Sequence, residues 1–84
     1  MATGFRITCA NKNQHGVIVR VGGQGWSLST HEAVRKLMSQ QIRLHIHLGN
    51  EYFDIGVRGD GTEAHLVLEP VGIPLHEVTE LPSC

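Results

Sequence analysis

Histidine and aspartate side chains in the second half of the chain are placed where they could bind a metal. His45 and Asp54 stand at equal distances on either side of a Gly-Asn turn, so they face each other if the two segments pair. His65, on the next segment, is then expected opposite Gly56 and diagonal to Asp54. Two imidazoles and a carboxylate form open iron sites, and zinc accepts the same ligands. We favour the alternative of a solvated sheet face and expect no cofactor, because convergent rotamers cannot be read from sequence.

The same face is a candidate surface for protein–protein contact. Its expected members are Arg43, His45, His47, Tyr52, Asp54 and His65. Small antiparallel sheets often bury an open face against a second copy, and twofold dimers are the commonest assembly. Tyrosine and imidazole groups make this face less charged than a fully solvated one, and histidines would make the contact sensitive to pH. The pattern therefore predicts a protein partner or a homodimer.

Three glycines in the first half of the chain could cradle an anion. Gly22, Gly23 and Gly25 lie between an expected strand and an expected helix, where backbone N–H groups can hold a phosphate. Neither the dinucleotide fingerprint nor the P-loop pattern is present, however. We favour a tight connection that lets the chain turn past Trp26. We expect Trp26 itself to be buried in the core beneath the helix.

The two cysteines, Cys9 and Cys84, are expected to be free thiols. Cys9 shares a strand face with Ile7, which favours a buried, inert thiol. The first residues lack the pattern of a signal peptide, so we expect a reducing, cytoplasmic location. The alternative is a disulfide, possible if the segment around Cys84 packs beside the first strand. No base is placed to activate either sulfur and no hydrolase or metalloprotease motif occurs, so we expect no enzymatic activity.

The elements that must position these residues follow from the hydrophobic period. Residues 5–9 alternate and residues 17–21 are β-branched, which predicts two paired strands. Ser29 is expected to cap a helix, with Glu32 completing a capping box. The apolar face of that helix is expected to comprise Ala33, Val34, Leu37 and Met38.

Three more strands, residues 42–48, 51–57 and 64–68, form a predicted meander. The turns Gly49-Asn50 and Gly59-Asp60-Gly61-Thr62 set its register. The expected inward pairs are Ile46–Phe53, Leu44–Ile55 and Ile42–Val57, followed by Ala64, Leu66 and Leu68 against Val57, Ile55 and Phe53. Residues 70–84, with three prolines, are expected to be an irregular tail. The order ββαβββ predicts one α+β domain, residues 1–84, with the helix on one face of an antiparallel sheet.

Composition excludes two classes of partner. Seven Lys and Arg residues oppose eight Asp and Glu residues, for a formal net charge of −1, and no basic stripe is visible. We therefore expect no nucleic-acid binding. The apolar runs are short and strand-like, so we expect no membrane association.

Three motifs together resemble a known family. They are Ile7-Thr8-Cys9, then Val21-Gly22-Gly23 followed by Trp26 and a Ser-capped helix, and finally Leu81-Pro82-Ser83-Cys84. In order and spacing they are similar to an uncharacterised family of short bacterial proteins, domain of unknown function 3892. The resemblance implies no activity. We therefore expect a small non-enzymatic protein-interaction module, and the alternatives are a metal-binding protein and a small-ligand or nucleotide binder.

Overall fold

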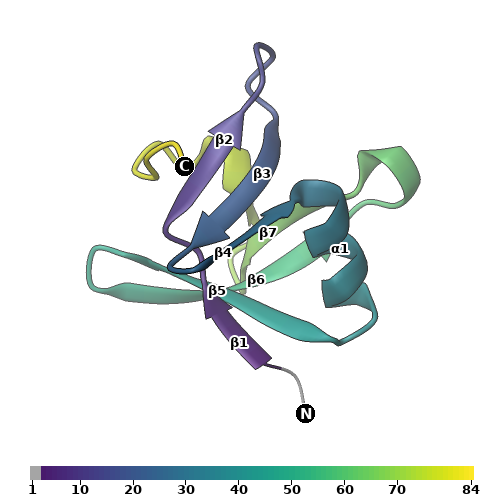
Figure 1. The fold of residues 1–84 in the computed structure, drawn as a ribbon, viewed down its shortest axis with the longest axis horizontal. Coiled ribbons are helices and arrows are strands. Elements are labelled where there is room, and N and C mark those ends of the chain that lie inside the picture. The colour runs from purple at the N-terminus through teal and green to yellow at the C-terminus, as the bar shows by residue number, and fades with distance from the viewer. Residues whose placement is uncertain (1–2) are drawn as a thin grey trace.

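The computed structural model describes residues 3–84, which form two sheets and one α-helix (Figure 1). The five-stranded sheet has the order β1-β5-β6-β7-β8, and the three-stranded sheet has the order β2-β3-β4. The strands are β1 (Thr3–Arg6), β2 (Cys9–Lys12), β3 (Ile18–Gly23), β4 (Trp26–Ser29), β5 (Ile42–Leu48), β6 (Glu51–Arg58), β7 (His65–Glu69) and β8 (Ile73–Pro74). The helices are α1 (Thr30–Met38) and the 3-10 turns η1 (Gly61–Glu63) and η2 (Leu75–Glu77). The expected α+β class is confirmed. No helix of the described residues is long and apolar enough to cross a membrane.

The first expected strand is in fact two strands in different sheets. β1 runs parallel to β5, whereas β2 runs antiparallel to β3. The chain passes from the larger sheet to the smaller one at Ile7 and Thr8. The Ile7 N–H donates to the His45 carbonyl at 2.8 Å, and the Thr8 N–H donates to the Gly22 carbonyl at 2.9 Å. Ile7 points into the core and is 1% exposed. The alternating pattern persists through such a corner, so it cannot distinguish one strand from a strand that changes sheet.

One apolar core fills the space between the two sheets and α1. Its buried members come from both sheets, α1 and η2: Ile7, Ala10, Ile18, Val21, Ala33, Val34, Leu44, Ile46, Ile55, Leu66, Leu68 and Leu75. The smaller sheet and the helix therefore share one face of the larger sheet. The side chains that alternate with these core residues on β5 and β6 point away from the core, which places the candidate surface on the opposite face.

The Ser29 cap at the start of α1 is confirmed, but the Glu32 carboxylate bonds to the Ser29 hydroxyl and not, as in a full capping box, to its backbone N–H. The Ser29 hydroxyl accepts a hydrogen bond from the Glu32 N–H at 3.1 Å and donates one to the Glu32 carboxylate at 3.2 Å. The Thr30 hydroxyl donates to the Ile18 carbonyl at 2.8 Å and so ties the helix start to β3. The expected apolar face is wrong at Met38, which is 66% exposed because it is the last helical residue and lies beside an open cleft.

The hairpin of β5 and β6 has the expected turn but a shorter ladder than expected. Ile46 pairs with Phe53, as predicted, and the pairing ends where His45 meets Asp54. Because the β5–β6 register does not continue past His45, the pairs expected beyond it are wrong. On their other edges, residues 42–45 pair with β1 and residues 54–58 pair with β7. The two strands diverge from this point, and α1 packs across their open end (Figure 1).

The register between β6 and β7 differs from the prediction by two residues. Ile55 pairs with Leu68, and Val57 pairs with Leu66. The cause is the connection, because η1 lengthens what was expected to be a four-residue turn. A shift by an even number keeps every side chain on its expected face. It moves His65, however, from Gly56 to a position opposite Arg58.

Residues 70–84 are more ordered than the irregular tail that was expected. β8 pairs with β7, and η2 follows with Leu75 in the core at 1% exposed. The chain then returns to the smaller sheet, where the Ala10 N–H of β2 donates to the Pro82 carbonyl at 3.0 Å. The prolines are accommodated because Pro74 lies in the edge strand β8, whereas Pro70 lies in the turn before it and Pro82 lies outside the strands, so no ladder hydrogen bond is needed from them.

Candidate functional site

Four predicted surface residues gather at the hairpin of β5 and β6. We call His45, His47, Tyr52 and Asp54 the hairpin cluster. The Tyr52 ring stacks on His45 with centroids 5.3 Å apart and meets His47 edge-on at 5.2 Å, and the two imidazoles are 5.9 Å apart. The Tyr52 hydroxyl donates to the Asp54 carboxylate at 3.0 Å. These contacts follow from the predicted register, which places His47 opposite Tyr52 and His45 opposite Asp54.

The carboxylate of Asp54 raises the pKa of Tyr52. The pKa of Tyr52 is raised above its ordinary value, chiefly because the hydroxyl donates a hydrogen bond to Asp54, with burial and the charge of Asp54 acting in the same direction. The charge of Arg43 acts the other way and lowers it. Tyr52 is nevertheless 55% exposed. The hairpin cluster is therefore an organised group of side chains that solvent or a partner can reach.

His65 does not join this cluster, and the predicted metal triad is not assembled. The His65 ring lies 6.5 Å from His76, and its Nδ1 is 3.0 Å from the Glu63 carbonyl. Within residues 3–84, no group of three or more His, Cys, Asp or Glu side chains is placed to hold a metal ion. The physical reason is the two-residue register shift, which carries His65 along β7 and away from Asp54.

An ion pair separates His65 from the hairpin cluster. Glu69, opposite Asp54, reaches across Gly56 to the guanidinium of Arg58. A Cβ on Gly56 would lie 2.6 Å from a Glu69 carboxylate oxygen, so the glycine leaves room for that crossing. Of the six predicted surface residues, Arg43 and the hairpin cluster therefore share the hairpin side of this ion pair, and His65 lies on the other side.

The structure adds a cleft that the sequence did not predict. It lies where β5 and β6 diverge beneath the end of α1, and its volume is about 1010 Å³. Its apolar lining includes Leu37, Leu44 and Ile55, and its charged lining includes Arg43 and Asp54. The alternating pattern gave no signal for it, because alternation predicts which face a residue takes and not whether two strands remain paired.

The glycine segment does not form the loop proposed for anion binding. Gly22 and Gly23 belong to β3, and Gly23 pairs with Trp26 across a two-residue turn in which Gly25 has φ 79°. β4 separates this turn from α1, so the turn does not lead into a helix N-terminus. The indole of Trp26 lies over Gly23, where a Cβ would come within 2.3 Å of Nε1, and its ring is 5.6 Å from that of Phe5. Trp26 is thus a half-buried residue packed on the edge of the core.

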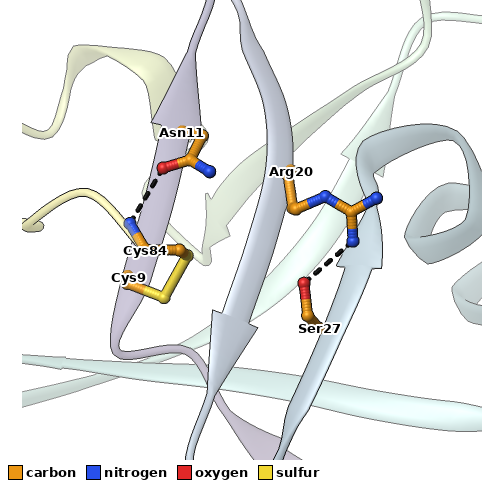
Figure 2. Close-up of a disulfide and its surroundings, with 5 residues drawn as sticks. All are labelled: Cys9, Asn11, Arg20, Ser27 and Cys84. Atoms are coloured by element: carbon orange, nitrogen blue, oxygen red, sulfur yellow. Dashed lines mark hydrogen bonds between the residues drawn. A yellow bond between two sulfur atoms is a disulfide. The ribbon is translucent and has the colours of Figure 1, made fainter.

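The two cysteines are joined by a disulfide, so the expectation of free thiols is wrong (Figure 2). Cys9 and Cys84 are 75 residues apart in sequence, and their Cα atoms are 5.0 Å apart. The Cys84 N–H also donates to the Asn11 side-chain oxygen at 2.8 Å. A Cβ on Gly22 would lie 3.1 Å from the Cys9 sulfur and 3.3 Å from the Cys84 sulfur, so this glycine makes room for the bond.

Comparison with known families identifies the domain. The family model described as "Protein of unknown function (DUF3892)" matches residues 6–71. The chain belongs to the DUF3892 family. No curated protein and no solved structure matches the chain significantly.

The DUF3892 match confirms the predicted resemblance and assigns no activity. It includes the Ile7-Thr8-Cys9 motif, the Trp26 hairpin, the cleft and the whole hairpin cluster. It ends before Leu81 and therefore excludes Cys84, which completes the disulfide.

Proposed function

We propose that this DUF3892 domain is a non-enzymatic protein-interaction module that self-associates through Arg43 and the hairpin cluster. The observation that supports the proposal is the mutual contact of the His45, His47 and Tyr52 rings, one pair stacked and two edge-on, on the sheet face that points away from the core. Aromatic side chains held by their neighbours lose little conformational entropy on binding, which is why such residues are enriched at interfaces.

Charge on the same face favours a second copy as the partner. Arg43 and Asp54 are both exposed and carry opposite charges. In a twofold interface each patch meets its own copy, so Arg43 of one chain can lie against Asp54 of the other. A small domain of 84 residues also gains stability from burying additional apolar surface against a partner.

The test is the molar mass of the oxidised protein in solution, measured by sedimentation equilibrium over a range of concentrations. We expect a dimer that Tyr52→Ala weakens. Val71→Ala is the matched control, because Val71 is also 55% exposed but lies outside the patch. A monomer at every concentration, or equal weakening by both variants, would reject the proposed surface.

A charge exchange separates a contact between chains from a loss of local structure. Arg43→Asp and Asp54→Arg are each expected to weaken the dimer, because each places like charges across the twofold axis. A mixture of the two single variants is expected to associate, since both cross-axis pairs are then oppositely charged. If the mixture associates no more strongly than either variant alone, this arrangement is contradicted.

The cleft between β5 and β6 favours a second candidate function, the binding of a small amphipathic ligand. Ligand sites usually combine apolar side chains with a few convergent charged groups. This cleft combines Leu37, Leu44 and Ile55 with Arg43 and Asp54, and the larger part of its exposed lining is polar. The test is a thermal-shift screen of apolar carboxylates and amines, with Val57→Trp as a variant that fills the cleft. A compound that stabilises both proteins equally does not bind there.

A further inference from the structure

The Cys9–Cys84 bond attaches a weakly held segment to the edge of the smaller sheet. We call residues 79–84 the closing segment. Two backbone hydrogen-bond donors join it to β2: the Ala10 N–H to the Pro82 carbonyl at 3.0 Å, and the Cys84 N–H to the Asn11 side chain at 2.8 Å. Leu81 is half-buried against the core, but Pro82, Ser83 and Cys84 are exposed. The disulfide is therefore the main attachment of the last residues of the segment.

β2, in contrast, is held by contacts that do not involve the closing segment. Its four residues pair with β3, and Ala10 is buried in the core. β3 in turn pairs with β4, and the Arg20 guanidinium donates to the Ser27 hydroxyl at 2.9 Å (Figure 2). These contacts remain when the disulfide is broken, whereas the closing segment keeps only its two hydrogen bonds and the Leu81 contact.

We infer that Cys9–Cys84 is a reversible thiol–disulfide site at which a dithiol reductant releases the closing segment and leaves the rest of the fold intact. The two cysteine residues differ in exposure: Cys84 is exposed, whereas Cys9 is half-buried. An incoming thiolate therefore attacks the Cys84 sulfur. In a reducing compartment, disulfides are usually transient or regulatory rather than permanent.

The exchange balances as two linked steps. A thiolate of the dithiol bonds to the Cys84 sulfur, the bond between the two cysteines breaks, and its electron pair leaves on Cys9, which takes up a proton. The second thiol of the reductant then attacks the reductant's first sulfur, which is bonded to Cys84 in the mixed disulfide. This step forms a disulfide within the reductant and releases Cys84 as a thiol. The reductant is oxidised to a disulfide, and both cysteines are reduced.

Release of the closing segment changes the edge of the smaller sheet. The N–H of Ala10 loses its acceptor, and the side-chain oxygen of Asn11 loses its donor. An unpaired strand edge is a surface to which another extended chain can add. The redox state of this site therefore determines whether β2 is covered.

The test is amide hydrogen exchange on the full chain, oxidised and in dithiothreitol, with alkylation mass shifts to count the thiols. On reduction we expect the Ala10 and Cys84 amides to lose protection while amides of β3 and β5 keep theirs. Reoxidation should restore the original pattern. If all amides exchange together on reduction, the disulfide is required for the whole fold. If Ala10 keeps its protection, the closing segment stays attached without the disulfide. Either result overturns the inference.

Two variants keep the result interpretable. Cys84→Ser should show the open pattern with or without dithiothreitol. Asn11→Ala removes one hydrogen bond but keeps the disulfide, so its oxidised form should still protect Ala10. An open pattern in oxidised Asn11→Ala would assign the attachment to the hydrogen bond and would also overturn the inference. Both readouts are independent of the proposed self-association, which uses the other sheet.

Discussion

At the scale of single residues, three ring contacts and one hydrogen bond hold the hairpin cluster together. The Tyr52 hydroxyl donates to Asp54, and this raises the pKa of Tyr52. Because the folded protein then holds the phenolic proton more tightly than the unfolded chain does, the bond stabilises the fold fully below the ordinary tyrosine pKa. That contribution is lost as the pH rises through the raised pKa of the folded state.

The resulting prediction concerns Asp54→Ala. We expect the pKa of Tyr52 to fall towards its ordinary value, since the acceptor and its charge are both removed. Ultraviolet absorbance of the phenolate reports this directly, because Tyr52 is the single tyrosine of the chain. Glu51→Gln, which removes a neighbouring exposed carboxylate, is the control and should leave the titration almost unchanged. An unaltered titration in Asp54→Ala would show that the hydrogen bond does not form in solution.

At the scale of elements, the hairpin of β3 and β4 depends on close contact between Gly23 and Trp26. A Cβ on Gly23 would lie 2.3 Å from both the indole Nε1 and the Arg6 carbonyl oxygen. The backbone oxygen cannot move aside as a flexible side chain can. We therefore predict that Gly23→Ala destabilises the protein by about 1–3 kcal/mol, the usual cost of an overpacked site.

Urea unfolding followed by tryptophan fluorescence measures this cost, because Trp26 is the single tryptophan. Gly4→Ala is a matched control, since a Cβ on Gly4 meets nothing within 4 Å. The contact would be disproved if the two variants unfolded at the same urea concentration.

Elements set by local sequence were predictable, and those set by distant contacts were not. Ser29 and Glu32 lie three residues apart and form the cap by themselves, and the Gly49-Asn50 turn fixes the pairing of Ile46 with Phe53. The parallel pairing of β1 with β5 joins residues about forty positions apart, which no period reveals. His65 is the informative case: its face was predictable, but its neighbour depended on the length of the turn at η1.

At the scale of the whole molecule, the disulfide adds to a small core. A domain of 84 residues buries a smaller share of its surface than a larger one, so a crosslink has a proportionately greater effect. The sequence could show that two cysteines existed, but their approach depends on β8 and η2 returning the chain to β2. β8 was not predicted.

The same bond predicts how stability changes with redox state. Closing a loop between residues 75 apart in sequence restricts the unfolded chain, and the chain-entropy relation gives about 4 kcal/mol at this length. Urea unfolding should therefore show a lower midpoint for the reduced protein, with a cooperative transition that persists. Cys9→Ser should match the reduced wild-type protein whether or not reductant is present, because neither has the crosslink. Since most of the effect acts on the unfolded chain, the lower midpoint should accompany a folded state that retains the contacts of β3 and β5. A reduced protein with no cooperative transition would instead mean that the core cannot hold the two sheets together without the bond.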